Sequence, residues 1–269
     1  NSQDNRFIGN TGNNTYQGNG GNDYFYDEVG NDTYIYNLGD GWDTIQDQNG
    51  YDTIKIGEGV SLSDLRLSNQ LNKNLEILFN NNDGNILIQD YFTNDSNKIE
   101  KIEFADGSYI ENISQYINII ASEDDIILPE GYKEAHLCGN NNTSATGNNL
   151  DNHLEGGAGN NTYKGNAGND DTWDLDGDDT YIYNVGDGND YIRDYGGNND
   201  TIQFGAGITS TNIQFAHNQD NYNNLEISFN GIEGGITIED YFDENQNKKI
   251  ENFTFSDGTT ISDISSYLN

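Results

Sequence analysis

The stretch GNGGNDYFYDEVGNDTYIY, from Gly18 to Tyr36, sets the period of the chain. Cut into nine-residue units from Gly9 to Ile35, the sequence reads GNTGNNTYQ, GNGGNDYFY and DEVGNDTYI. Each unit has glycine at position four, Asn or Asp at position six and an aromatic residue at position eight. A fixed short period indicates a repeat architecture, in which each unit buries its apolar side chains by stacking on the next.

The second half of the chain repeats the first. The units GGAGNNTYK, GNAGNDDTW and DLDGDDTYI cover Gly156 to Ile182. The segment LEILFN at 75–80 returns as LEISFN at 225–230, and IQDYF at 88–92 returns as IEDYF at 238–242. The aspartates also match at an offset of 147 positions, which pairs Asp23 with Asp170, Asp32 with Asp179 and Asp43 with Asp190, while Asp52 matches Asp200 after one inserted residue. We therefore expect two copies of one composite unit.

A nonapeptide of this kind divides into a turn and a short strand. Two nonapeptides complete one coil of a flattened helix, so strands of alternate repeats stack in parallel and position eight points inward. The inward residues are predicted to be Phe7, Tyr16, Phe25, Tyr34, Ile45 and Ile54 in the first copy and Leu154, Tyr163, Thr172, Tyr181, Ile192 and Ile202 in the second. The predicted fold is all-β, with tandem parallel β-rolls that form a solenoid. One inward side chain per repeat makes a core too thin to stabilise the structure alone.

Each array is followed by a section with fewer glycines, in which Leu, Ile and Phe alternate with polar residues as in antiparallel strands. We expect unit 1 over 1–120, with its roll at about 5–57 and a small antiparallel β capping section at about 58–120. Unit 2 is expected over 140–269, with its roll at about 140–205 and its capping section at about 206–269. The junction is placed at 121–139, around the only proline, Pro129. Short helical turns are predicted near 61–65 and 111–117.

The charge of the chain limits its partners. Its 46 acidic and 11 basic residues give a net charge of −35, which disfavours nucleic acid and anionic membranes. There is no run of apolar residues long enough for a membrane-spanning helix, so direct membrane insertion is not expected. Cys138 is the only cysteine, so an internal disulfide is not possible. The many carboxylates repel one another in a compact chain, and bound cations would relieve that repulsion. A multivalent metal is the first explanation to consider, and a halophilic surface is the second.

The composition of the turns indicates which metal. Glycines expose backbone carbonyl oxygens, position six adds a carboxylate, and turns two repeats apart stack on one edge. Each gap between turns is then lined by hard oxygen atoms, a donor set that suits several Ca²⁺ ions better than Mg²⁺. In later repeats Asp27, Asp47, Asp174 and Asp194 replace glycine at position one and are expected to add a second carboxylate. The predicted metal ligands are Gly18, Gly20, Gly21, Asp23, Asp27, Gly30, Asp32, Gly39, Gly41, Asp43, Asp47, Asp52, Gly165, Gly168, Asp170, Asp174, Gly177, Asp179, Gly186, Gly188, Asp190, Asp194 and Asp200.

These repeats closely resemble the glycine-rich nonapeptide of haemolysin-type (RTX) calcium-binding proteins, G-G-x-G-x-D-x-(apolar)-x. The segments NLEILFNNNDGNILIQDYF and IEKIEFADG resemble the domain that follows such repeats in large RTX proteins. The resemblance implies a calcium-binding parallel β-roll that is exported from a Gram-negative bacterium by type I secretion. It also implies a chain that stays unfolded in the low-calcium cytosol and folds outside the cell.

The early repeats of each array depart from this pattern. Asn5, Asn14, Asn152 and Asn161 stand where the family has Asp. An amide oxygen still coordinates calcium but brings no charge, so these sites are expected to be weak or empty. The alternative is a coil capped by asparagine without metal.

The functional hypothesis is a non-enzymatic calcium-binding module, a fragment of a larger secreted toxin, adhesin or surface protein. A second hypothesis is an extracellular carbohydrate-binding or adhesion module with a glycan or cell-surface partner. Trp42, Tyr51, Trp173 and Tyr195 could then line a sugar site. Burial distinguishes the two hypotheses, because an aromatic ring packed under a neighbouring coil cannot stack on a sugar. No set of residues with catalytic spacing supports an enzyme, and the sequence leaves the oligomeric state open.

Overall fold

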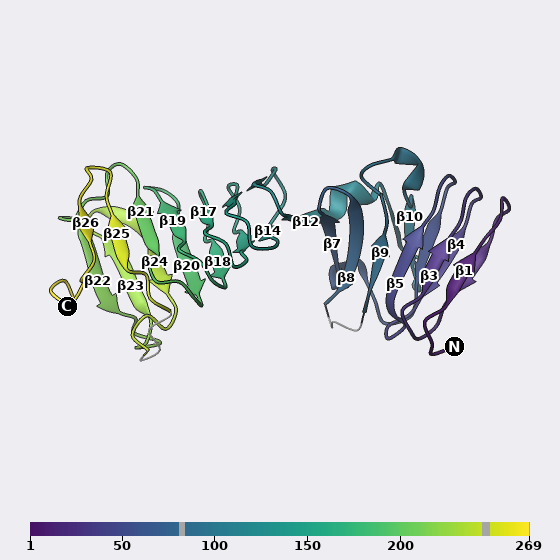
Figure 1. Cartoon of the computed structure of the whole chain (residues 1–269), viewed down its shortest axis with the longest axis horizontal. Coiled ribbons are helices and arrows are strands. Elements are labelled where there is room, and N and C mark those ends of the chain that lie inside the picture. Colours follow the sequence, from purple (N-terminus) through teal and green to yellow (C-terminus); the bar gives the residue numbers. More distant parts are fainter. Residues whose placement is uncertain (81–83, 244–247, 269) are drawn as a thin grey trace. The chain divides into compact units, whose positions relative to one another are not determined.

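The computed structural model describes residues 1–80, 84–243 and 248–268, and the chain divides into two compact units, Asn1–Ile119 and Ile120–Asn269. In each unit, short strands lie side by side along the solenoid (Figure 1). Both units are built almost wholly of strands and turns, and unit 1 also contains a few short 3₁₀ helices. Among the described residues, the longest helices are far too short to cross a lipid bilayer.

The roll of unit 1 consists of two parallel sheets. One sheet contains β1 (Arg6–Ile8), β3 (Tyr24–Tyr26) and β5 (Gly41–Gln46), and the other contains β2 (Thr15–Gln17), β4 (Thr33–Tyr36) and β6 (Thr53–Ile56). Odd and even strands alternate along the chain, so two consecutive strands and their turns make one coil. This is the parallel β-roll that the nine-residue period predicts, and the predicted fold class is confirmed.

The register of the strands puts the position-eight residues into rows. Phe7 pairs with Phe25, and Phe25 with Ile45, in one sheet. In the other sheet Tyr16 pairs with Tyr34, and Tyr34 with Ile54. All but Phe7 are buried; Phe7 lies in the first strand and is half-buried. Each ring covers the next, as in the stacked pair Tyr16–Tyr34 with centroids 5.2 Å apart.

The capping section of unit 1 extends both sheets rather than forming a purely antiparallel layer. Its β9 (Gly84–Ile88) pairs in parallel with β5, and its β10 (Lys101–Phe104) pairs in parallel with β6. Antiparallel strands then follow: β8 (Asn74–Phe79) and β7 (Leu65–Gln70) beside β9, and β11 (Tyr109–Glu111) beside β10. The backbone groups at the open edges of β5 and β6 are thereby paired.

Three short 3₁₀ helices lie in this section. These are η1 (Leu62–Asp64), η2 (Asp95–Asn97) and η3 (Ile113–Tyr116). The first and third occur in the two segments predicted to form helical turns. Strand β12 (Ile117–Ser122) carries the chain from unit 1 into unit 2.

Unit 2 has the same construction with three more parallel strands in its roll. One sheet contains β14 (Glu134–Leu137), β16 (His153–Glu155), β18 (Asp171–Asp174), β20 (Asn189–Asp194), β24 (Ile232–Ile238), β23 (Leu225–Phe229) and β22 (Ile213–His217). The other contains β13 (Ile126–Ile127), β15 (Ser144–Thr146), β17 (Thr162–Lys164), β19 (Thr180–Tyr183), β21 (Thr201–Phe204), β25 (Asn252–Thr254) and β26 (Thr260–Ile261). As in unit 1, the parallel strands come first and antiparallel strands close each sheet.

The segment 121–139, predicted as a junction, contains two strands of the roll of unit 2. β13 pairs in parallel with β15, and β14 with β16, so coils stack before residue 140. The turns of these coils contain Gly131 and Gly139 but lack the complete glycine-rich nonapeptide pattern. They keep an inward small or apolar residue, as in the pairing of Ala135 with Leu154. In the next strand of that row Thr172 takes the inward position, still buried, between Leu154 and Ile192.

Candidate calcium sites in the stacked turns

Position-six residues of successive coils are joined into ladders by hydrogen bonds. The backbone N–H of Asn14 donates to Asp32 Oδ1 (2.6 Å), and the N–H of Asp32 donates to Asp52 Oδ1 (2.7 Å). The opposite edge of unit 1 repeats this pattern, from Asn5 to Asp23 (2.7 Å) and from Asp23 to Asp43 (2.9 Å). One carboxylate oxygen of each aspartate is thus used to fix the coil below it.

Unit 2 has the same two ladders. On one edge the N–H of Asn161 donates to Asp179 (2.6 Å), and that of Asp179 donates to Asp200 (2.7 Å). On the other edge the N–H of Asn152 donates to Asp170 (2.8 Å), and that of Asp170 donates to Asp190 (3.1 Å). The position-six aspartates of the prediction therefore lie in stacked series along the edges of both rolls.

Many aspartates of the turns, at position six and at position one, have a buried carboxylate oxygen without a hydrogen-bond partner. Such oxygens belong to Asp23, Asp32, Asp47, Asp52, Asp170, Asp174 and Asp179. A buried carboxylate oxygen without a partner costs free energy unless a proton or a cation satisfies it. These atoms are the strongest structural indication that the turns bind a cation.

The acidic side chains also converge. Among the described residues, one group with carboxylate oxygens within 4.8 Å of one another is Asp32, Asp47 and Asp52. The second such group is Asp179, Asp194 and Asp200, in the equivalent turns of unit 2. All members are buried. Three carboxylates at this distance repel one another strongly unless positive charge lies between them.

Position-one aspartates are oriented by inward tyrosines. The hydroxyl of Tyr34 donates to Asp47 (2.6 Å), and that of Tyr181 donates to Asp194 (2.8 Å). Asp27 accepts from Tyr16 and Asp174 accepts from Tyr163 in the same way. The tyrosines of β2 and β4 in unit 1, and those of β17 and β19 in unit 2, therefore fill the core with their rings and hold the turn carboxylates with their hydroxyls.

Burial raises the pKa of the clustered carboxyl groups. Desolvation raises the pKa of Asp52 to about 7 and that of Asp200 to about 8, with nearby carboxylates adding to the effect. The pKa of Asp47 is raised to about 6, again chiefly by burial, although the Tyr34 hydroxyl opposes the shift. A divalent cation would reverse these shifts, because its charge favours the ionised form.

Backbone carbonyl oxygens complete the oxygen lining. A Cβ added at Gly30 would lie 2.8 Å from both Gly12 O and Asp32 Oδ2, so these two oxygens face the same small space. A Cβ at Gly177 would lie 2.6 Å from Gly159 O and 3.0 Å from Asp179 Oδ2. Carbonyl and carboxylate oxygens, without sulfur or imidazole, are the donors that Ca²⁺ prefers. The residues present therefore fit calcium.

The glycines act in two different ways. Seven predicted glycine ligands have positive φ, namely Gly21, Gly39, Gly41, Gly168, Gly177, Gly186 and Gly188. Gly18 and Gly165, at position one, do not have positive φ. They provide space instead, because a Cβ at Gly18 would lie 1.9 Å from Asp23 Oδ2. Gly20 has neither positive φ nor a close neighbour.

Asparagine at position six makes contacts that aspartate cannot. The side-chain N–H groups of Asn161 donate to the carbonyls of Asn141 (3.2 Å) and Thr143 (3.3 Å). Asn152 donates similarly to the carbonyl of Tyr132 (3.3 Å). The amide nitrogen thus satisfies backbone oxygens that would otherwise face a cation. This geometry supports coils capped by asparagine at these two positions.

Two acidic residues of the ladders were missed from the sequence. The N–H of Asp52 donates to Glu100 Oε2 (2.7 Å), and the N–H of Asp200 donates to Glu251 Oε2 (2.8 Å). Each glutamate therefore extends its ladder by one residue beyond the last aspartate. A signal was present: Glu100 precedes inward Ile102 by two residues, the same spacing as Asp52 and Ile54, but no glycine turn accompanies it.

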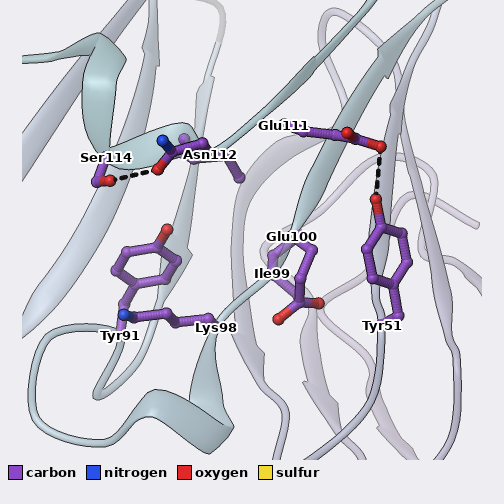
Figure 2. Close-up of a pocket in the computed structure, with 9 residues that line it drawn as sticks. Tyr51, Tyr91, Lys98, Ile99, Glu100, Glu111, Asn112 and Ser114 are labelled. Atoms are coloured by element: carbon purple, nitrogen blue, oxygen red, sulfur yellow. Dashed lines mark hydrogen bonds between the residues drawn. The ribbon is translucent and has the colours of Figure 1, made fainter.

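Glu100 also borders a hollow of 240 Å³ in the capping section of unit 1. Figure 2 shows Tyr51 donating to Glu111 (2.7 Å) at one side of this hollow and Ser114 donating to Asn112 (2.9 Å) at the other. Unit 2 has a counterpart of 320 Å³ beside Glu251. The hollows adjoin the ends of the carboxylate ladders in both units.

Comparison with known proteins agrees with the repeat analysis. Residues 74–111 and 224–263 match the model of the haemolysin-type calcium binding protein related domain. The predicted resemblance to haemolysin-type proteins is thereby confirmed. The matched segments lie within the two capping sections and include Glu100 and Glu251.

One similar solved structure is an extracellular lipase, LipA, from Serratia marcescens, with 16% identity and a TM-score of 0.25. The alignment covers 88% of this chain and 36% of the lipase chain. A likeness of this size carries no argument about activity. No curated protein matches the sequence.

Proposed function

We propose that this chain is a calcium-binding RTX repeat module that binds several Ca²⁺ ions in its turns and folds when it binds them. The observation that carries the proposal is the set of buried, unpartnered carboxylate oxygens at Asp23, Asp32, Asp52, Asp170 and Asp179. The donor set and the matched domain both support calcium as the ion. The ligands would be the turn aspartates, with Glu100 and Glu251 at the ladder ends.

The energetic cost of the metal-free state supports folding coupled to binding. Each buried polar atom without a partner costs about 1–3 kcal/mol. Four such aspartate oxygens occur in unit 1 and three in unit 2. The total is comparable with the free energy of unfolding of an ordinary domain, about 5–15 kcal/mol. Bound calcium would remove this cost and add its own binding free energy.

The expected affinity places the folded state outside the cell. Extracellular calcium modules have a Kd of roughly 10⁻⁴ to 10⁻³ M. Sites of that affinity stay empty in the cytosol and fill in an extracellular medium. We therefore propose that the module is secreted, by type I export from a Gram-negative bacterium, and that it supports the secretion and structure of a larger toxin, adhesin or surface protein. We assign the module no catalytic role.

Far-UV circular dichroism during a calcium titration from EDTA tests the proposal, with magnesium as the control ion. The expected result is a cooperative gain of β signal with calcium and none with magnesium. Isothermal titration on the same sample should give several ions per chain. A spectrum that is already β-rich in EDTA at neutral pH and indifferent to calcium would overturn the proposal.

A further inference from the structure

Trp42 lies on the outer face of the roll of unit 1 and keeps 64% of its surface exposed. Side chains of β5 alternate between the faces of the sheet, so Asp43 and Ile45 are buried whereas Trp42 is not. The same sheet position in unit 2 is polar: Trp42 pairs with Asn85 on β9, and Asn189 pairs with Gly235 on β24. The fold therefore does not require an indole at this place.

A hollow of 210 Å³ adjoins the indole. Its walls come from four neighbouring strands, β5, β9, β8 and β7, and are formed by Trp42, Asp43, Thr44, Gln70, Glu76, Asn85 and Leu87. Leu87 is the only aliphatic side chain among them. The remaining walls consist of amide, hydroxyl and carboxylate groups beside one large aromatic face.

The polar groups of this hollow are held in fixed orientations. Gln70 Nε2 donates to Glu76 Oε2 (2.8 Å), and Asn85 Nδ2 donates to the other oxygen of Glu76. Asn85 is itself buried, with 6% of its surface exposed. Three planar polar groups thus form one network across adjacent strands, prepared to accept and donate hydrogen bonds at the edge of the indole.

We propose that this hollow, the Trp42 hollow, binds a neutral carbohydrate. The apolar C–H face of a sugar ring would stack on the exposed indole, and its hydroxyl groups would bond to the network of Gln70, Glu76 and Asn85. Anionic glycans are disfavoured by Glu76 and by the net charge of −35. The proposal needs only a folded unit 1 and no particular occupancy of the calcium sites.

The sequence provides its own fluorescent reporter. Trp42 and Trp173 are the only tryptophans, so Trp173→Phe leaves Trp42 as the single tryptophan emitter. This variant, shown to be folded by circular dichroism in calcium buffer, would be titrated with dextran, laminarin and galactomannan as neutral probes and with hyaluronan, which does not gel with calcium, as an anionic one. We expect a saturable shift or quench of Trp42 emission with at least one neutral polysaccharide and none with hyaluronan.

Affinity gel electrophoresis with the responding polysaccharide then tests the residues. Trp42→Asn places the residue found at the equivalent position of unit 2, so it should fold normally and lose affinity roughly ten- to hundredfold. Glu76→Gln should weaken binding in the same range. Tyr109→Ser is the matched control, since it removes an aromatic residue that is 56% exposed on the other sheet of unit 1, and it should bind as the unmodified chain does.

Three results would overturn the proposal. The first is a folded chain whose Trp42 emission responds to none of the neutral polysaccharides. The second is retention of full affinity by Trp42→Asn. The third is a response of Trp42 emission to protein concentration alone, which would identify the hollow as a contact between copies of the chain.

Discussion

Replacing Asp179 by asparagine should narrow the difference in stability between the calcium-loaded and the metal-free chain. Asp179 Oδ1 accepts the N–H of Asn161, and Oδ2 is buried without a partner. Asn161 lies one rung below on the same ladder, and its amide nitrogen already bonds to two carbonyls. In Asp179→Asn the new amide nitrogen would face Gly159 O, because a Cβ at Gly177 would lie close to both that oxygen and Asp179 Oδ2.

The substitution should stabilise the metal-free chain and destabilise the calcium-loaded chain. In EDTA the substitution removes an unpartnered buried oxygen, so the free energy of unfolding should rise by about 1–3 kcal/mol. In saturating calcium it removes one of the three carboxylates of the group formed with Asp194 and Asp200. A ten- to hundredfold loss of affinity at that site would reduce the stabilisation by calcium by about 1.4–2.7 kcal/mol.

Urea unfolding, followed by far-UV circular dichroism in EDTA and in calcium, measures both effects. If the unmodified chain is already unfolded in EDTA, a folding osmolyte is added until the chain folds. Extrapolation to zero osmolyte then gives the same free energy of unfolding. Asp178→Asn is the matched control, because it removes the same charge at an exposed neighbouring position. Equal destabilisation of Asp179→Asn in both media, or behaviour identical to that of Asp178→Asn, would refute the reasoning.

Three further outcomes are expected. Without metal, carboxyl groups whose pKa is raised by burial, such as Asp52 to about 7 and Asp200 to about 8, bind protons more tightly when folded, so the metal-free chain should be most stable near the ordinary Asp pKa, about pH 4, and lose stability as the pH rises from there through 7 to 8; a chain in EDTA that becomes more stable between pH 5 and pH 8 would contradict this. Gly18→Ala should cost roughly 1–3 kcal/mol of stability in calcium, because its Cβ would meet Asp23 Oδ2 at 1.9 Å, whereas Gly20→Ala, with no atom nearer than 3.7 Å, should be nearly neutral in thermal unfolding. Glu100→Gln should raise the calcium concentration at the folding midpoint of unit 1, while Glu103→Gln, three residues further along on β10 and paired with lysines, should leave it unchanged; equal midpoints for both variants would show that Glu100 does not belong to the ladder.

Local features of the sequence were sufficient for the core of the rolls. The nine-residue period fixes which side chains point inward, because turn and strand lengths recur and the strand alternates its faces. Phe25, Tyr34 and Ile45 could therefore be assigned to the interior, and Asp23 and Asp32 to the turns, from the sequence alone. The helical turns at Leu62–Asp64 and Ile113–Tyr116 were also foreseen, since they lie where the alternation breaks.

Contacts between distant parts of the chain could not be obtained in this way. Glu100 reaches the ladder of Asp52 only because a long excursion through β7, β8 and β9 returns β10 to the side of β6. The coils of β13 and β14 lack the glycine signature and become rungs only by pairing with the strands that follow. The Trp42 hollow likewise joins four strands whose order is decided by sheet pairing. The sequence by itself determines the repeat, because the repeat depends only on the spacing of nearby residues. The positions of Glu100 and Glu251 at the ladder ends, and the network of Gln70, Glu76 and Asn85, depend on pairing between strands that are tens of residues apart. Only the tertiary structure decides those pairings.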